Sequence, residues 1–265
     1  MKKALKSLAR ILLPAPLYAR LTAISARRWI ERVERTQGLD ALTQRYIAAC
    51  GRTVLRGPFQ GMTYSPLADR RHIGARLLGC YEQEIAPAVE RCCGTEYAQV
   101  IDVGCAEGYY AIGFARRIPT AQVTAFDTDP WARRACRDLA ALNNVSERVS
   151  VRGFCSAEKL QASLGEGRAL LVLDCEGYEA TLLDPELVPG LAQCDMIVEL
   201  HDAPATPDHL LVQRFRETHD VELIPSVPRT TDDAAPLDQF SPAEQLALMD
   251  EMRHAWQGWA IFTRK

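Results

Sequence analysis

The sequence predicts an α/β protein built on a doubly wound, Rossmann-like sheet with helices on both faces. Short, almost wholly apolar runs alternate with segments of helical pattern from residue 98 to residue 226. Such runs are strands buried on both faces, and a parallel sheet needs helices on each face to cover them. Several of the runs also end in an acidic residue, at the edge where sheets of this type bind ligands.

The alternation gives the expected order of elements. The predicted strands lie at residues 98–103, 121–127, 148–153, 169–174, 195–200 and 220–226. The predicted helices lie at residues 108–117, 130–143, 156–164, near 178–190 and at 207–217. After a loop at 225–240, Ser241 and Glu244 form a capping-box pattern at the start of one more helix, and residues 259–263 have the pattern of a last strand.

Two segments precede the predicted sheet. Residues 1–50 are expected to form a helical extension, and residues 1–35 carry a charge of +7 whereas the other 230 residues carry −10. These basic helices could lie on an anionic membrane surface, or they could pack on the body of the protein or on a second subunit. Residues 51–95 are expected to form a hairpin and then a mainly helical stretch at 77–91, with Pro87 late in it.

The composition excludes several classes of partner. The 265 residues are 48% hydrophobic and 25% charged with a net charge of −3, which is typical of a globular protein without a nucleic-acid partner. Nine scattered cysteines, with no C-x-x-C pair and no Cys/His cluster of zinc spacing, indicate free thiols, so we expect a cytoplasmic protein. We predict no transmembrane helix, since no run of 18 apolar residues is present, and no signal peptide.

The most informative stretch is residues 98–108, where Val100-Ile101 leads into Asp102, followed by Gly104 and Gly108. It predicts a buried strand, a tight glycine turn and a helix. Glycine lacks Cβ and tolerates positive φ, so a ligand could approach the backbone of this turn closely. The alternative is a plain connecting loop that happens to contain two glycines.

Acidic residues close four of the predicted strands. They are Asp102, Asp127, Asp174 and Glu199, the last followed by His201 and Asp202. Asp127 ends the strand after the glycine turn, where a carboxylate accepts hydrogen bonds from ribose hydroxyls. The turn lacks the G-x-G-x-x-G pattern that cradles a pyrophosphate. Its Glu107 and the acidic rim would repel phosphate and suit a cationic sulfonium, which favours S-adenosylmethionine over NAD.

These segments resemble the class I S-adenosylmethionine-dependent methyltransferases and, within them, the FkbM family. The matching segments, within residues 98–202, are 101–110 (IDVGCAEGYY), 124–130 (TAFDTDP), 143–144 (NN), 173–183 (LDCEGYEATLL) and 197–201 (IVELH). Ala106 is a departure, because many methyltransferases have a glycine there. The resemblance implies a seven-stranded sheet whose last strand is antiparallel. We expect the methyltransferase domain at 96–265, and residues 51–95, which carry no assigned motif, are expected to cover the cofactor and substrate.

The resemblance also implies roles for individual residues. The expected cofactor is S-adenosyl-L-methionine. Its binding residues would be Asp102, Gly104, Cys105, Ala106 and Gly108 near the methionine end, Asp127 and Thr128 at the ribose, Phe154, Cys155 and Ser156 near the adenine, and Asp174. The expected acceptor is a hydroxyl of a small molecule, such as a polyketide product, or of a sugar or glycan.

Catalytic roles are open to more than one interpretation. His201 could act as a base, because histidine takes a proton near neutral pH, or it could bond to the nearby loop. Asp174, Glu176 and Glu199 could orient the acceptor, or they could hold a divalent ion such as Mg²⁺. Glu179 is expected to cap or solvate the following helix. Tyr81 and Glu82 could cover the cofactor as a lid, or they could simply pack.

Two other functions are consistent with the sequence. One is a non-catalytic adapter that keeps the cofactor-binding fold. The other is a nicotinamide-dependent oxidoreductase, which the glycine pattern disfavours. The sequence names neither the acceptor nor the oligomeric state.

Overall fold

The structure is a computed structural model that describes residues 38–70, 73–201, 205–233, 237–251, 253 and 258–265. The expected basic helices at residues 1–37, and Asp202, lie outside these residues. No helix in the described part of the chain has the length and apolar character to cross a membrane. All nine cysteines are described, and all are free.

A seven-stranded sheet forms the centre of the molecule, with the strand order β3-β2-β1-β4-β5-β7-β6. The strands are β1 Gln99–Val103, β2 Gln122–Phe126, β3 Val149–Arg152, β4 Ala169–Leu173, β5 Cys194–Leu200, β6 His219–Pro225 and β7 Gly258–Arg264. The first five strands pair in parallel, and β7 is antiparallel to both β5 and β6. The predicted fold, including the antiparallel last strand, is therefore confirmed.

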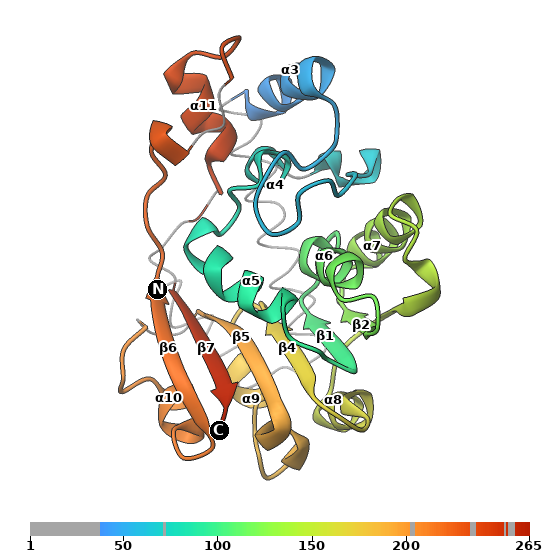
Figure 1. Cartoon of the computed structure of the whole chain (residues 1–265), viewed down its shortest axis with the longest axis vertical. Coiled ribbons are helices and arrows are strands. Elements are labelled where there is room, and N and C mark those ends of the chain that lie inside the picture. The colour runs from blue at the N-terminus through green and yellow to red at the C-terminus, as the bar shows by residue number, and fades with distance from the viewer. Residues whose placement is uncertain (1–37, 71–72, 202–204, 234–236, 252, 254–257) are drawn as a thin grey trace, which may run out of the picture.

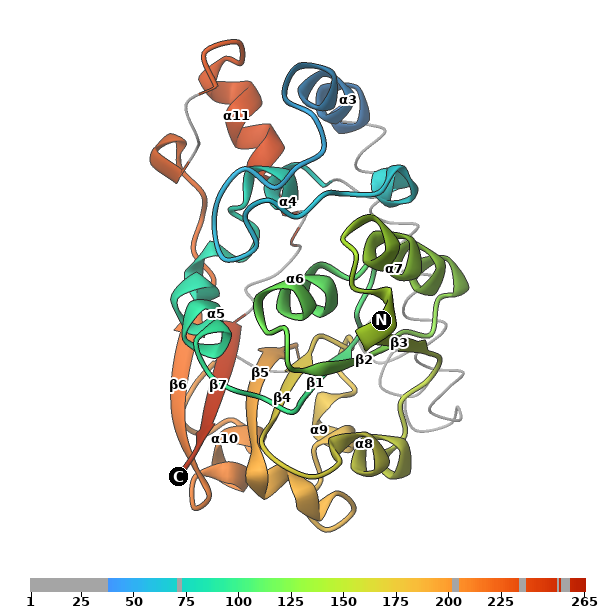
Figure 2. The ribbon, with the colours of Figure 1, turned by 45° about the vertical axis from the view of Figure 1, so that its right-hand side comes forward.

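Helices cover both faces of this sheet (Figure 2). One face carries α5 Ala86–Cys93, α6 Tyr109–Arg117 and α7 Pro130–Leu142, and the other carries α8 Ala157–Leu164, α9 Glu179–Leu182 and α10 Leu210–Phe215. The alternation of side chains along β1 divides the apolar core accordingly: Val100 packs with the α6 face and Ile101 with the α8 face. Strands β4 and β5 are buried along their whole length, as their apolar sequences predict.

Two predicted helices differ from the structure because of proline. The helix expected near 178–190 is reduced to α9 and the separate 3₁₀ turn η4 Pro189–Gln193. Pro185 and Pro189 lack the N–H that a continuous helix needs. The stretch 77–91 divides into α4 Gly74–Leu78, η2 Gln83–Ile85 and α5. Pro87 lies in the first turn of α5 rather than late in a helix, because only there is its missing N–H harmless.

The predicted hairpin is smaller than expected. It consists of one antiparallel bridge between Thr53 and Thr63, beside a 2.8 Å hydrogen bond from Val54 N to Met62 O. Asn143, at the end of α7, holds this hairpin with its side chain. Its amide Nδ2 donates to Thr63 O and its Oδ1 accepts from Thr63 N, at 2.8 and 2.9 Å. The hairpin is thereby fastened to the sheet domain.

A helical layer lies at the α6 side of the molecule (Figure 1). It contains α3 Leu39–Cys50, α4 and α11 Pro242–Met249, and α11 packs against both α3 and α4. The predicted capping box at the start of α11 is confirmed, with Ser241 and Glu244 bonding each other's backbone. We call residues 51–85 together with α11 the cover. The cover thus joins the segment before the sheet to a segment near its last strand.

Candidate functional site

A pocket lies between the cover and the carboxyl ends of β1, β2 and β4, where ligands bind in doubly wound sheets. It encloses about 1160 Å³, part of which is open to solvent. Most of the predicted cofactor residues line it: Asp102, Gly104, Cys105, Ala106, Asp127, Thr128, Phe154, Cys155 and Asp174. Gly108 and Ser156 are not among the lining residues. Ser156 instead caps α8, where its Oγ accepts a hydrogen bond from Lys159 N.

The turn after β1 requires its glycines. Gly104 has a φ of 91°, and a Cβ there would lie 1.7 Å from the carbonyl oxygen of Asp174. Gly108 caps α6 with a φ of 101°, and its Cβ would lie 2.8 Å from Cys136 Sγ. Ala106 also has a positive φ, 49°, at the position where many methyltransferases have glycine. The turn therefore brings the ends of β1 and β4 into direct contact beneath the pocket.

Asp102 is almost fully buried beneath this turn. Its Oδ2 accepts a hydrogen bond from Ala111 N in α6 at 2.9 Å. Burial raises the pKa of Asp102 to about 8, despite that hydrogen bond. The carboxyl is therefore mostly protonated at neutral pH.

Asp127 ties the glycine turn to the end of β2. Its Oδ2 accepts from Ala106 N at 2.9 Å, and its Oδ1 accepts from Asp129 N at 2.7 Å. Each carboxylate oxygen can accept two hydrogen bonds, so the same group can also accept from hydroxyls of a ligand.

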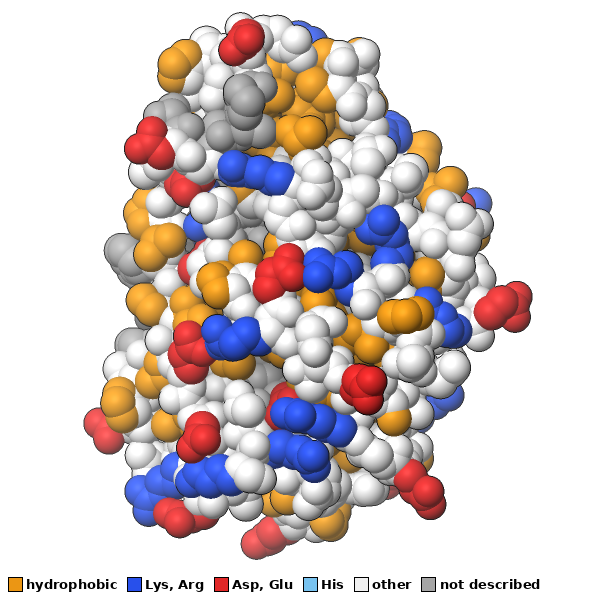
Figure 3. All heavy atoms as spheres, viewed as in Figure 1, with side chains coloured by type: hydrophobic (Ala, Val, Ile, Leu, Met, Phe, Trp, Pro, Cys, Tyr) orange, Lys and Arg blue, Asp and Glu red, His pale blue; other side chains and the backbone are white. Residues whose placement is uncertain are grey.

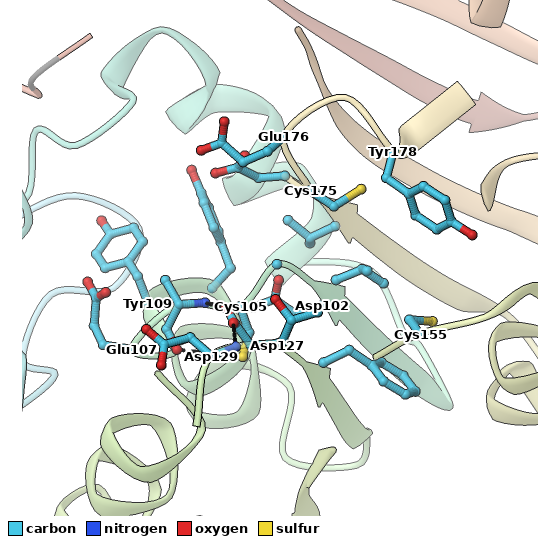
Figure 4. A pocket seen from close by; sticks show the side chains of 18 of the residues that line it. Asp102, Cys105, Glu107, Tyr109, Asp127, Asp129, Cys155, Cys175, Glu176 and Tyr178 are labelled. Carbon is cyan, nitrogen blue, oxygen red and sulfur yellow. Dashed lines mark hydrogen bonds between the residues drawn. The ribbon is translucent and has the colours of Figure 1, made fainter. Parts of the chain in front are cut away.

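Two aromatic rings line one end of the pocket. The ring centroids of Phe154, after β3, and Tyr178, before α9, are 5.6 Å apart. Figure 4 shows Tyr178 and Cys155 at one side of the pocket, Asp127 in the middle, and Glu107 and Tyr109 at the other side. Tyr178 was not among the predicted site residues, although it lies within the matching segment 173–183.

His201 lies among three carboxylates. Its Nε2 is 3.4 Å from both Asp174 Oδ1 and Glu199 Oε2, and its Nδ1 is 3.1 Å from Glu179 Oε1. Burial alone would lower the pKa of His201, but the hydrogen bonds to Asp174 and Glu179 outweigh burial and raise it to about 12. His201 is therefore a cation at neutral pH, which favours the interpretation in which it bonds to neighbouring residues; its role as a base stays a prediction.

The three carboxylates around His201 differ in their pKa values and contacts. Burial would raise the pKa of Asp174, but its hydrogen bond to His201 holds it at about 2. Burial and the charge of Asp174 raise the pKa of Glu199 well above its usual range. Glu179 is buried in the first turn of α9 and accepts from Cys175 N at 2.8 Å, so it bonds the backbone before the helix, as a capping role expects, and does not solvate it. It also holds His201 in place.

Arg253 is a second cation at this edge of the sheet. Its Nη1 lies 2.9 Å from Glu199 Oε1, its Nη2 lies 3.0 Å from Glu82 Oε1, and its Nε lies 2.8 Å from Glu251 Oε2. Glu82 also accepts from the hydroxyl of Tyr110. Burial raises the pKa of Glu82 to about 7, although Arg253 opposes the shift. The cover and β5 are thus joined through buried charges that no local sequence pattern revealed.

Two groups of described residues bring three potential metal ligands within 4.8 Å of one another. They are Asp174, Glu176 and His201, and Glu82, Asp174 and Glu199. In the structure, His201 and Arg253 already supply positive charge to these carboxylates. Asp174, Glu199 and Glu82 thus already have cationic partners, and the binding of Mg²⁺ by these residues stays a prediction.

Arg76 corrects the interpretation of Glu107 as an uncompensated charge. Glu107 is fully buried, and its Oε1 lies 2.9 Å from Arg76 Nε. The guanidinium of Arg76 lies over the ring of Tyr81, 3.8 Å from its centroid. Both Arg76 and Tyr81 line the pocket, as the lid interpretation of Tyr81 expected. An arginine in a short helix of the cover carried no sequence signal for this position.

The topology, the position of the pocket and the acidic end of β2 are those of the Rossmann-like methyltransferase fold. Comparison with known proteins agrees. The family model of the ribosomal protein L11 methyltransferase (PrmA) matches residues 87–168. Over 122 residues the chain is 30% identical to the ribosomal protein L11 methyltransferase of Trichlorobacter lovleyi (strain ATCC BAA-1151 / DSM 17278 / SZ), covering 46% of this chain and 37% of that protein.

Two solved structures of methyltransferases have a similar fold. A putative O-methyltransferase from Klebsiella pneumoniae is 16% identical with a TM-score of 0.46, covering 86% of this chain and 98% of that chain. The O-methyltransferase TomG from Streptomyces achromogenes is 14% identical with a TM-score of 0.46, covering 77% of this chain and 92% of that chain. The PrmA match ends at residue 168, one residue before β4, so it covers β1 to β3 and none of Asp174, Glu199 and His201.

Proposed function

We propose that the protein transfers a methyl group from S-adenosyl-L-methionine to a hydroxyl of a small molecule or glycan, as an FkbM-like methyltransferase. The charge of the pocket is the main support. Among its described lining residues, six are acidic (Asp102, Glu107, Asp127, Asp129, Asp174 and Glu176), and Arg76 is the one Lys or Arg. Asp102 is mostly protonated and Arg76 balances Glu107, so the other four carboxylates carry the surplus charge. A pocket with surplus negative charge favours a cationic ligand, and the sulfonium of this cofactor is a cation.

The walls of the pocket suit the parts of the cofactor in order. Phe154 and Tyr178 offer aromatic surface for the adenine, and Asp127 offers carboxylate oxygens for the ribose hydroxyls. When bound, the cofactor would supply an electrophilic methyl group for transfer to the acceptor oxygen, with its thioether as the leaving group. Alignment of the two reactants contributes much of the rate of such an in-line displacement.

Asp174 would orient the acceptor. It lines the pocket with 35% of its side chain exposed, whereas Glu199 and Glu179 are buried behind it. The His201 cation keeps Asp174 ionised, so this carboxylate can accept the hydrogen bond of the acceptor hydroxyl and then its proton, which passes on to water. His201 and Glu199 act as positioning residues.

The PrmA match favours a second acceptor, a protein, because the matching family is named for ribosomal protein L11. The match, however, ends before β4 and so concerns the cofactor half of the sheet. We prefer a hydroxyl because the acceptor side resembles the FkbM segments at 173–183 and 197–201. The face in Figure 3 shows basic and acidic side chains of described residues interspersed, which gives no support for nucleic acid.

Calorimetric titration tests this proposal. The protein should bind S-adenosylhomocysteine and not NAD, and Asp127→Asn should weaken S-adenosylhomocysteine binding by about tenfold or more, since it loses a charged acceptor for the ribose hydroxyls. Wild-type protein that binds no S-adenosylhomocysteine would contradict the proposal. Transfer of a labelled methyl group to sugar hydroxyls, and not to ribosomal protein L11, would separate the two acceptors, and absence of all turnover would favour an adapter.

A further inference from the structure

The Glu107 side of the pocket contains an unsatisfied acceptor. The side chain of Glu107 is 1% exposed, and its Oε2 has no hydrogen-bond partner among the described residues. A buried carboxylate oxygen without a donor is costly, since it has lost its hydration without replacement. Its neighbour Oε1 receives both the Arg76 ion pair and a hydrogen bond from Tyr64. A donor from a ligand in the pocket would satisfy Oε2.

Arg76 stands beside this acceptor. It is the one Lys or Arg among the described residues that line the pocket, its side chain is 12% exposed, and the Tyr81 ring fixes its guanidinium. An arginine has five N–H donors, so Arg76 keeps donors beyond the Nε atom that faces Glu107. A cation and an anion therefore lie side by side at one end of a pocket whose other walls are acidic.

The position of the pair along the pocket identifies its ligand. Figure 4 shows Glu107 on the side opposite Tyr178 and Cys155, with Asp127 between them. If adenine lies by Phe154 and ribose by Asp127, the amino-acid end of the cofactor extends toward Glu107. That end carries one carboxylate and one ammonium group, which complement Arg76 and Glu107.

We propose that Arg76 and Glu107 form a clamp for the α-amino acid end of the cofactor, in which Arg76 binds the carboxylate and Glu107 Oε2 accepts from the ammonium group. This inference rests on the proposed function, since it assumes that S-adenosyl-L-methionine occupies the pocket. It assigns a role to Arg76 of α4, outside the segments that resemble methyltransferases. Cofactor binding would then fasten the cover to the glycine turn.

Two adenosine ligands test the clamp by calorimetry. S-adenosylhomocysteine has the amino-acid end, and 5′-methylthioadenosine lacks it. The wild-type protein should bind S-adenosylhomocysteine at least tenfold more tightly than 5′-methylthioadenosine. Arg76→Met and Glu107→Gln should each lower the affinity for S-adenosylhomocysteine about tenfold and change that for 5′-methylthioadenosine less than twofold. Asp127→Asn should weaken both ligands, and Arg91→Met, which alters an exposed ion pair with Glu222, should weaken neither.

The outcomes separate the two proposals. If the wild-type protein binds neither ligand, the proposed function fails. If it binds both equally, or if Arg76→Met weakens both to the same extent, the cofactor site stands and the clamp is wrong. Should the variants fail to fold, wild-type protein can be titrated with the analogues of S-adenosylhomocysteine that lack the carboxylate or the amino group. Each should bind at least fivefold more weakly than S-adenosylhomocysteine, and equal binding would overturn the clamp.

Discussion

The two halves of the site are built in different ways. The proposed cofactor half, at the ends of β1, β2 and β3, uses backbone groups, glycines and single carboxylates that come from one stretch of about 55 residues, to which Arg76 and Tyr178 are added from outside it. The acceptor half, at the ends of β4 and β5, uses buried ion pairs among Glu82, Asp174, Glu199, His201 and Arg253, whose positions span 171 residues. We conclude that a change in the first half should alter ligand affinity, whereas a change in the second should alter stability and turnover.

Gly104→Ala should have the largest effect, because this residue lies where the halves meet. Its new Cβ would lie 1.7 Å from Asp174 O, so the ends of β1 and β4 would have to separate. We expect a destabilisation on the order of 4 kcal/mol, measured by urea unfolding, together with loss of S-adenosylhomocysteine binding. Gly153→Ala, at a pocket glycine with open space around it, is the control. Equal stability of both variants would show that the turn can adjust.

Arg253→Met should lower the stability of the protein without lowering its affinity for the cofactor. It leaves Glu82 and Glu199 buried without their shared cation, and loss of one partner from a buried ion pair costs about 3–5 kcal/mol. Thermal unfolding should therefore begin at lower temperature, while the folded variant keeps its affinity for S-adenosylhomocysteine within about twofold. Arg91→Met, at an exposed pair, should change stability by less than about 1 kcal/mol. A large loss of S-adenosylhomocysteine affinity in Arg253→Met would contradict the division of roles.

Asp102 makes the stability of the cofactor half depend on pH. Its pKa is raised from 3.8 to about 8 by burial, so between these values the folded protein holds a proton that the unfolded chain has lost. The proton on Asp102 contributes fully to the free energy of unfolding below about pH 4, and this contribution is lost as the pH rises through 8. Relative to Asp102→Asn, the wild-type protein should lose on the order of 1 kcal/mol per pH unit from pH 5 to 8 in urea unfolding. Parallel pH profiles for the two proteins would contradict this assignment.

Chelation should have the smallest effect. Because His201 and Arg253 balance the carboxylates of the acceptor half, EDTA should leave methyl transfer unchanged once an acceptor is found. Loss of activity in EDTA and recovery with Mg²⁺ would show instead that a divalent ion enters this set.

The expected cytoplasmic location and the contact of the basic N-terminal segment with membranes also remain proposals.

The same contrast explains which features could be predicted. The strands, the glycine turn, Asp102 and Asp127 follow from patterns a few residues long, so the sequence was sufficient for them. The protonation of His201 could not be predicted, because it depends on Glu179 and Glu199 together with Asp174 in the folded chain. Arg76 and Arg253 were missed because an isolated arginine gives no sign of its distant partner. The short α9 was missed because the pattern at 178–190 was given more weight than its two prolines.

The position of β7 has a consequence for biosynthesis. Strand β6 pairs with β7 alone, and β7 lies between β5 and β6 although it follows both in the chain. While the ribosome is still making residues 226–257, β6 has no strand to pair with, and the β5 edge that carries Glu199 is open. The sheet edge beside Glu199 is therefore completed only when β7 has been made, and the proposed acceptor half is the last part of the site to form.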